Sequence, residues 1–253
     1  MASVKDRKRT AVVTGGSRGI GLGIAASLLA RGASVAVTYR GDDAAANRAE
    51  EGLRKKAAAG GEILFLKGDA GDPAAVAGQH RQIRDAFGDV DILVNNAGIM
   101  NRRPFDAISI EDWDETIRVN LNGAFYWMQR VVPAMKAGNF GRIVNVSSIA
   151  ARGGGVVGPH YAASKAGMVG LTRYAAGELG PFGITVNAIA PAYIEDAGIF
   201  TKWSDEQKEP LRQKVLVPRL GLVADVVRAF EYLLDSPFVT GVTLDVNGGA
   251  FMI

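Results

Sequence analysis

The sequence contains no cysteine among its 253 residues, so disulfide bonds and thiolate metal sites are excluded. It has only two histidines, His80 and His160, which are too few for a histidine-based zinc site, and we expect no bound metal. The lack of cysteine is compatible with a reducing compartment. We therefore expect a cytoplasmic protein.

Long apolar runs and a large charge of one sign are lacking as well. No stretch of about 18 apolar residues predicts a membrane span, and the polar N-terminus does not resemble a signal peptide. The net charge is +3, and the one basic run covers residues 5–9. We interpret residues 1–8 as a flexible, solvated end. No basic stripe or zinc-finger spacing supports a nucleic-acid partner, and we expect neither nucleic acid nor membrane to bind.

The composition that is present is ordinary for a globular protein, with 48% apolar and 22% charged residues. Short β-rich runs alternate with longer helical stretches. Strands are predicted over residues 10–14, 34–39, 62–67, 91–95, 142–147, 184–190 and 242–246. Helices are predicted over residues 19–30, 43–59, 73–87, 111–136, 160–179 and 224–234. This alternation predicts an α/β fold, a doubly wound parallel sheet with helices on both faces.

No linker or internal repeat divides the chain, so we predict a single domain over residues 1–253. One segment, residues 193–217, is charged and lacks a strand pattern. In a compact domain such an insertion is often a lid or binding loop, and we predict a substrate loop there. A variable surface excursion is the alternative.

Glycines follow the first predicted strand in the run from Thr14 to Gly21. Glycine permits a tight turn and a close approach of the backbone, and the next helix offers N–H donors to a pyrophosphate. The spacing of Gly15, Gly19 and Gly21 fits neither GxGxxG nor a P-loop. Dinucleotide binding is the favoured interpretation, and plain packing of strand on helix is the alternative.

Tyr161 and Lys165 are four residues apart, so a helix places both side chains on one face. An ammonium group at about 4 Å favours a phenolate by about 4 kcal/mol at an effective dielectric constant of about 20. That would lower the phenol pKa from about 10 by up to about 3 units, enough for proton exchange near neutral pH. The spacing alone is a weak signal, and a half-buried Tyr beside a solvated Lys is the alternative.

Together these motifs resemble the short-chain dehydrogenase/reductase family, over roughly residues 9–250. The resemblance is carried by Thr14-Gly-x-x-x-Gly19-x-Gly21, Asn95-Asn96-Ala97-Gly98, Asn120, Ser148 and Tyr161-x-x-x-Lys165. It implies a Rossmann-type domain with a seven-stranded parallel sheet. It also implies an oxidoreductase that is usually a homotetramer or homodimer.

The resemblance implies four catalytic residues. Tyr161 would be the general acid in carbonyl reduction, and Lys165 would lower its pKa and bind the nicotinamide ribose. Ser148 would stabilise the developing alkoxide, and its separation of thirteen residues from Tyr161 selects it over Ser147. Asn120 would support a water and proton relay behind the lysine. A turn serine and an asparagine at a helix kink are the alternatives for the last two.

The resemblance also implies a dinucleotide site. Asp69 would contact the adenine, and the backbone of residues 96–98 would approach the adenosine ribose. The expected cofactor-binding residues are Gly15, Ser17, Arg18, Gly19, Ile20, Gly21, Tyr39, Arg40, Asp69, Ala70, Asn96, Ala97, Gly98, Tyr161, Lys165, Pro191 and Ile194.

The end of the second strand bears on the choice between NADP(H) and NAD(H). It carries Arg40 and no acid that would repel a 2′-phosphate, and Arg18 lies in the glycine turn. Asp42 and Asp43 follow closely and weaken the argument. We predict that NADP(H) is preferred and that NAD(H) can be used.

Two residues depart from the family pattern. Pro191 is followed by Ala192 where glycine is usual, and Asp196 stands where a threonine often binds the carboxamide. We expect backbone groups of Ile194 to serve the carboxamide instead.

The motifs lead to an NADP-dependent carbonyl reductase or alcohol dehydrogenase with a small-molecule substrate. They are closest to 3-oxoacyl-acyl-carrier-protein reductases, so a 3-oxoacyl thioester or similar ketone is expected. Sugar 1-dehydrogenases are nearly as similar in residues 37–40 and 67–69. A non-catalytic dinucleotide sensor is a remote alternative. We expect the cleft walls to come from residues 100–103, 152–160 and 193–217, with His160 as either a substrate contact or a helix-start residue.

Overall fold

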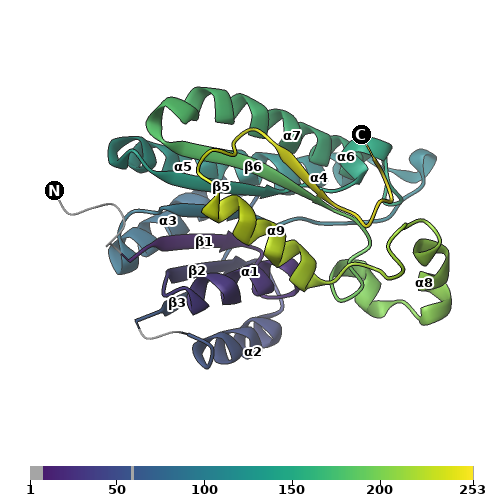
Figure 1. Ribbon diagram of the computed structural model, residues 1–253, viewed down its shortest axis with the longest axis horizontal. Helices are drawn as coiled ribbons and strands as arrows, with labels where there is room; N and C mark the ends of the chain where they lie inside the picture. The colour runs from purple at the N-terminus through teal and green to yellow at the C-terminus, as the bar shows by residue number, and fades with distance from the viewer. Residues whose placement is uncertain (1–7, 58–59, 253) are drawn as a thin grey trace.

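Figure 1 shows the computed structural model, which describes residues 8–57 and 60–252. This part of the chain forms one Rossmann-like domain. Its strands are β1 (Thr10–Thr14), β2 (Ser34–Tyr39), β3 (Glu62–Lys67), β4 (Ile92–Asn95), β5 (Gly141–Val146), β6 (Ile184–Pro191) and β7 (Thr243–Val246). Its α-helices are α1 (Gly19–Ala30), α2 (Asp43–Arg54), α3 (Pro73–Phe87), α4 (Ile110–Ile117), α5 (Gly123–Gly138), α6 (Ala150–Gly153), α7 (Pro159–Leu179), α8 (Asp205–Arg212) and α9 (Val223–Asp235). Shorter helical turns are η1 (Phe105–Ala107), η2 (Arg118–Asn122), η3 (Gly180–Phe182) and η4 (Gly198–Lys202).

The seven strands pair in parallel in the order β3-β2-β1-β4-β5-β6-β7, which confirms the predicted sheet. The chain winds outward from β1 to β3 and then returns to place β4 beside β1, with Val12 opposite Leu93. Ligands of such sheets bind outside the carboxyl ends of the strands where the winding direction reverses. The fold therefore points to the region where β1 ends at Thr14 and β4 ends at Asn95.

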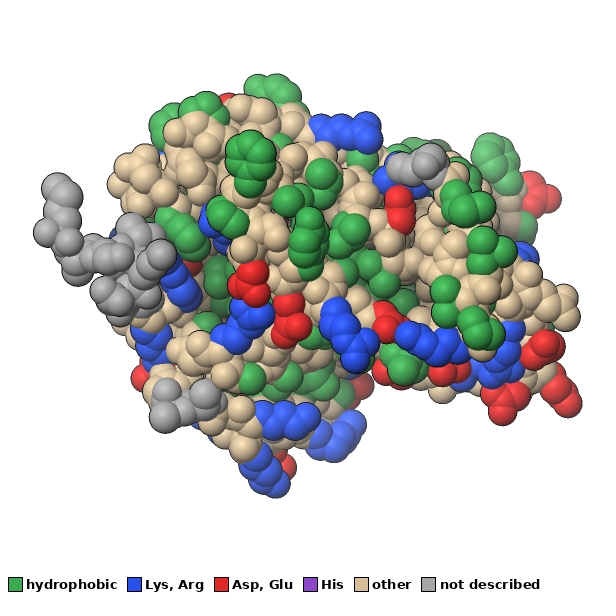
Figure 2. Space-filling model, in the orientation of Figure 1, with side chains coloured by type: hydrophobic (Ala, Val, Ile, Leu, Met, Phe, Trp, Pro, Cys, Tyr) green, Lys and Arg blue, Asp and Glu red, His purple; other side chains and the backbone are tan. Residues whose placement is uncertain are grey.

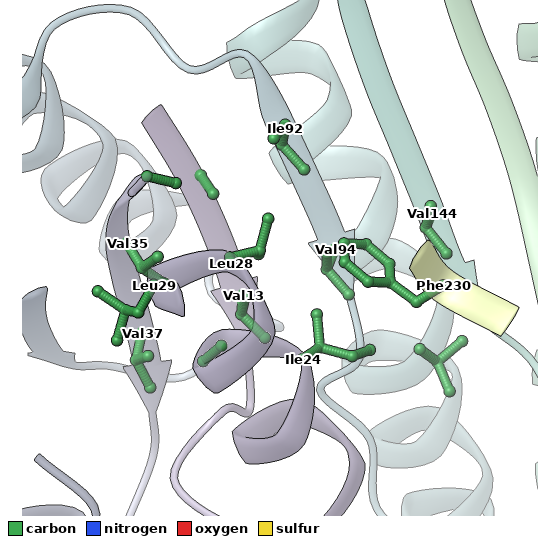
Figure 3. Packing of buried hydrophobic residues seen from close by; sticks show 14 of the residues in the cluster. Val13, Ile24, Leu28, Leu29, Val35, Val37, Ile92, Val94, Val144 and Phe230 are labelled. Atoms are coloured by element: carbon green, nitrogen blue, oxygen red, sulfur yellow. The ribbon is translucent and has the colours of Figure 1, made fainter. Parts of the chain in front are cut away.

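Alternation along the strands divides the core between two faces of the sheet. In β1, Val13 packs in one cluster with Leu28 of α1 and Phe230 of α9, which Figure 3 shows from close by. Its neighbour Val12 belongs to the opposite cluster, where Trp127 of α5 is completely buried. Helices α1, α2 and α9 thus cover one face, and α3, α5 and α7 cover the other.

The predicted ends of the elements need some correction. The second helix ends at Arg54 and not at residue 59, and residues 58 and 59 lie outside the described residues. The expected flexible end, residues 1–8, also lies outside them except for Lys8, whose ammonium pairs with Glu62 at 2.8 Å. No helix in the described ranges is both long enough and apolar enough to cross a membrane.

The helix predicted over residues 111–136 is a composite of three segments. It runs through α4, the π-helical turn η2 and α5, and the turn contains Asn120. Turns of this kind are rare and often occur at functional sites. The segment 193–217 is not wholly irregular, because η4 and α8 lie in it. The short helix α6 was also not predicted.

Candidate active site

A cavity of about 1000 Å³ opens at the carboxyl ends of the central strands. The glycine turn after β1, the residues after β4 and β5, and the segment after β6 line it. Every expected cofactor-binding residue except Gly21 lines this cavity. Every expected catalytic residue except Asn120 lines it as well. Segments far apart in the sequence therefore meet at one site.

Gly15 and Gly21, at the two ends of the glycine turn, have no room for a side chain. Gly15 has φ of 62°, and a Cβ atom there would lie 2.8 Å from Cα of Ala97. At Gly21, a Cβ atom would lie 2.5 Å from the Asn96 amide nitrogen. That amide donates hydrogen bonds to the carbonyl oxygens of Thr14 and Gly15, at 3.0 and 2.9 Å. Gly21 therefore supports the turn from behind, and the turn presents its backbone to the cavity.

The Thr14 hydroxyl completes this support because it accepts hydrogen bonds from the backbone N–H groups of Asn96 and Ala97, at 3.0 and 2.9 Å. Asn95 instead donates to the Asn145 side chain at 2.8 Å and connects two strands. The N-terminus of α1 lies directly after the turn. Its residues Gly19 and Ile20 line the cavity, where unpaired N–H groups favour an anion.

Charged residues surround the far end of the cavity, beyond β2 and β3. The Arg40 guanidinium lies 3.0 Å from the Glu115 carboxylate and 3.8 Å from that of Asp69. Arg118 of η2 donates to Asp69 at 2.9 Å, and the Gly71 amide donates to the same carboxylate at 2.9 Å. Burial alone would raise the pKa of Asp69, but these hydrogen bonds outweigh it and the pKa is lowered. Asp69 is therefore an anion held in a fixed orientation.

The carboxylates of the two acidic residues that follow β2 bind other groups of the protein. Asp42 accepts a hydrogen bond from the Ala45 amide at 3.0 Å and caps α2. Asp43 pairs with Lys67 at 2.7 Å. Arg18 is exposed, lines the cavity and makes no ion pair with any described residue.

Tyr161 and Lys165 lie on the first turns of α7, and both are almost completely buried. The Tyr161 ring packs against Ala150 and Val157. The Lys165 ammonium donates to the carbonyl oxygen of Val146, the last residue of β5, at 2.8 Å. It lies 5.7 Å from the centre of the Tyr161 ring.

The two serines after β5 have different surroundings. The Ser147 hydroxyl is buried and donates to the backbone carbonyl of Lys165 at 2.9 Å. The Ser148 hydroxyl accepts a hydrogen bond from the Ala150 amide at 3.1 Å and also contacts the Tyr161 hydroxyl. Ser147 thus serves the packing of α7, and Ser148 is the serine beside the phenol.

Protonation of the buried pair differs from the expectation drawn from the sequence. Burial raises the pKa of Tyr161, and the hydrogen bond with Ser148 only partly opposes this. Burial lowers the pKa of Lys165 to about 8. The expected lowering of the phenol pKa by Lys165 is therefore not found, because desolvation dominates and the ammonium group bonds to Val146. At pH 7 Lys165 is still mostly a cation.

Asn120 lies behind this pair in the π-helical turn and is completely buried. Its side-chain oxygen accepts from the Ile99 amide at 2.8 Å, and its amide nitrogen donates to the Ile99 carbonyl at 3.1 Å and to the Ser164 hydroxyl at 3.2 Å. Both amide hydrogens are thus used. The side chain thus fastens the segment after β4 to α7.

Hydrogen bonds hold both ends of the segment after β6. Ile194 pairs with Gly221, whose amide donates to the Tyr193 carbonyl at 3.1 Å and whose carbonyl accepts from the Glu195 amide at 2.9 Å. The Asp196 carboxylate accepts from the Val223 amide at 2.8 Å, at the start of α9. Asp196, which stands where the family often has a threonine, is therefore held by the N-terminus of α9. Residues 195–220 form a closed loop at the cavity, which we call the lid.

Several residues of the expected cleft walls lie elsewhere. His160 is buried, its Nε2 is 3.0 Å from the Asn101 carbonyl, and it does not line the cavity. Arg103 is near Asp112, at 3.5 Å. Arg118, which orients Asp69, is not among the residues predicted from the sequence. No motif marks it, because its role depends on a contact between distant segments.

Comparisons with known proteins agree with this geometry. A family model described as short chain dehydrogenase matches residues 9–208. The 3-oxoacyl-acyl-carrier-protein reductase FabG of Salmonella typhimurium is 36% identical over 247 residues, which cover 97% of this chain and 98% of the relative. The FabG protein of Escherichia coli has the same identity and coverage. That of Staphylococcus aureus is 36% identical over 246 residues, covering 96% of this chain and 98% of the relative.

Proposed function

The chain belongs to the short-chain dehydrogenase family, and from this premise we propose that it reduces ketones with NADPH, a 3-oxoacyl thioester or a similar ketone being the leading substrate. It is an oxidoreductase that acts on CH–OH and carbonyl groups. One observation carries the proposal. Ser148, Tyr161 and Lys165 line the same cavity as the glycine turn.

The residues of the cavity fit a nicotinamide dinucleotide. Gly15 offers backbone where any side chain would collide with Ala97, and the N-terminus of α1 favours the pyrophosphate. When bound, the reduced cofactor supplies a hydride to the carbonyl carbon. The proton that balances it comes from the Tyr161 hydroxyl, and Ser148 donates a hydrogen bond to the same substrate oxygen. The Lys165 cation then stabilises the phenolate that remains.

The preference for NADP(H) rests on charge. Arg18 and Arg40 line the cavity, and the acids after β2 are engaged in a helix cap and an ion pair. Arg40 must share its charge between Glu115 and a 2′-phosphate, so use of NAD(H) is compatible with the site. Arg40→Asp is expected to lower the ratio of kcat/KM with NADPH to that with NADH. An unchanged ratio would refute this role of Arg40.

We further propose a cytoplasmic homotetramer or homodimer in which residues 193–217 form the substrate loop. Support for the loop comes from its position, since residues 193–194 and 196–203 line the cavity. The 36% identity to FabG proteins over nearly the whole chain favours ketone reduction over the alternative, oxidation of an aldose at its first carbon.

A spectrophotometric screen of one purified sample tests the proposal. NADPH oxidation would be followed with acetoacetyl-CoA, and reduction of NAD⁺ and NADP⁺ would be followed with D-glucose. Turnover of the thioester supports the proposed function, and turnover of glucose alone would favour the alternative. Cofactor binding without turnover of either substrate would indicate a dinucleotide sensor.

A further inference from the structure

Three aromatic side chains line the cavity from one short stretch after β6. The Phe200 and Trp203 rings lie 5.1 Å apart between centroids, with an angle of 78° between their planes. The Tyr193 and Phe200 rings lie 6.3 Å apart at 79°. All three are only partly buried and line the cavity. Edge-to-face pairs of this kind leave ring surface for another aromatic group.

This aromatic cluster is connected to the catalytic tyrosine through Met100. The Met100 side chain packs against the cluster that contains Val157 and Tyr161. It also lies against the lid, because a Cβ atom at Gly198 would be 3.0 Å from its terminal methyl group. An apolar wall therefore runs from Tyr161 across Met100 to the turn that carries Phe200.

The backbone at the base of this cluster is strained. Tyr193 has φ of 51°, in the left-handed region that bulky residues rarely adopt. The pairing with Gly221 on its carbonyl holds that conformation. Strain of this kind persists only where surrounding contacts enforce it, and it concentrates at functional sites.

Polar groups along this wall are largely engaged. The Thr201 hydroxyl donates to the Gly198 carbonyl at 3.0 Å, and the Asp196 carboxylate caps α9. The Lys202 side chain is exposed. A polyhydroxylated substrate would leave hydroxyl groups without partners against such a wall, which disfavours its binding. A planar apolar group has no hydrogen bonds to lose on binding there.

We propose that the aromatic cluster of Tyr193, Phe200 and Trp203 binds an aryl ring attached to the substrate carbonyl. Among 3-oxoacyl compounds, the preferred substrates would then carry an aryl group beside the ketone, and those with an alkyl group there, like aldoses, would be poorer. This inference rests on the proposed ketone reduction. The ring takes no part in the chemistry: a hydride adds to the carbonyl carbon, the Tyr161 proton adds to the oxygen, and a secondary aryl alcohol leaves.

The test compares two 3-oxo esters that differ only in the group beside the ketone. NADPH oxidation would be measured with ethyl benzoylacetate, which carries a phenyl ring, and with ethyl acetoacetate, which carries a methyl group. We expect kcat/KM to be at least about tenfold higher for the phenyl substrate. In Phe200→Leu and Trp203→Leu the ratio of kcat/KM for the phenyl substrate to kcat/KM for the methyl substrate should fall about tenfold. Phe182→Leu is the matched control, because this ring is 37% exposed and lies outside the cavity.

Equal kcat/KM for the two esters, or equal losses for both in Trp203→Leu, would overturn the inference. A kcat/KM for D-glucose above that for ethyl benzoylacetate would also overturn the inference. If no carbonyl compound is reduced, the proposed function fails, and a binding measurement still decides the inference. Acetophenone should quench tryptophan fluorescence in the wild type and lose that effect in Trp203→Leu. The same quenching in both proteins would overturn the ring site.

Discussion

At the residue scale, the candidate site depends on a phenol and an ammonium group buried side by side. General acid catalysis by a positioned side chain contributes about 10²–10⁴-fold to a rate, so Tyr161→Phe should lower kcat by at least about a hundredfold. Cofactor affinity should change little, because the ring and its packing remain. Steady-state kinetics and a dinucleotide titration measure the two quantities. Tyr174→Phe, on the same helix but 73% exposed, is the control, and near-wild-type turnover of Tyr161→Phe would contradict the assignment.

Lys165 carries a stability cost that depends on pH. Its pKa is lowered by burial from 10.5 to about 8, so between these values the unfolded chain binds more protons than the native protein. Stability from this group therefore rises with pH in that window, and the full penalty is present below about pH 8. Between about pH 7 and about pH 9.5, the free energy of unfolding of the wild type should rise by about 2 kcal/mol relative to Lys165→Met.

Urea unfolding of both proteins at the two pH values measures this difference. Using the difference between variants removes the contribution of other titrating groups. Activity of Lys165→Met should be lost at both pH values, because the cation that we propose to stabilise the phenolate is gone. A pH-independent difference would mean that Lys165 is not buried as a cation.

At the element scale, one anchor of the lid is the hydrogen bond from the first amide of α9 to Asp196. Asp196 accepts from the first amide of α9, and loss of such a cap costs about 1 kcal/mol. Asp196→Ala should lower stability by that amount and also raise KM for the ketone, because the lid loses an anchor at the cavity. Asp72→Ala is the matched control: Asp72 caps α3 through the Ala74 amide at 2.8 Å, away from the lid. Thermal unfolding and kinetics of both variants separate the effects, and an unchanged KM in Asp196→Ala would exclude an anchoring role.

The elements of the sheet could be predicted because buried parallel strands are apolar runs bounded by turn residues. Helix α8 was missed since its sequence is polar and contains Pro210, although the capping box formed by Ser204 and Gln207 is a usable signal. The π-helical turn could not be predicted. It accompanies hydrogen bonds between Asn120 and Ile99, and contacts across the chain leave no local pattern.

Within the candidate site too, local sequence patterns could be interpreted and contacts between distant segments could not. The types and spacing of Ser148, Tyr161 and Lys165 pointed to one cavity, because each follows a predicted strand or lies on a predicted helix. The direction of the Tyr161 pKa shift could not be predicted, since burial of the phenol depends on packing against Val157. The pairing of Arg40 with Glu115 likewise depends on two segments that meet only in the folded chain.

At the scale of the whole molecule, large apolar side chains are exposed on two separate faces. One face belongs to helices α4, α5 and α7, which pack together and expose Trp113, Phe125 and Tyr174. The other lies over α9 and β7, where Figure 2 shows hydrophobic side chains gathered, and Tyr232 is 54% exposed. Exposed apolar patches mark interaction surfaces, and two distinct faces suit a tetramer built from two kinds of twofold contact.

If the protein is the proposed tetramer, charge placed on either face should split it into dimers. Tyr174→Glu is expected to give dimers held by the α9 and β7 face, and Tyr232→Glu is expected to give dimers held by the α5 and α7 face. A carboxylate buried in an apolar contact without a partner is unfavourable enough to break it. The double variant should sediment as a monomer of 26.6 kDa. Sedimentation velocity distinguishes tetramers, dimers and monomers. Leu216→Glu is the control, because Leu216 is exposed in the lid and its variant should stay tetrameric. A wild type that sediments as a monomer would contradict the assembly itself, and dimers in the double variant would show that a different surface holds the subunits together.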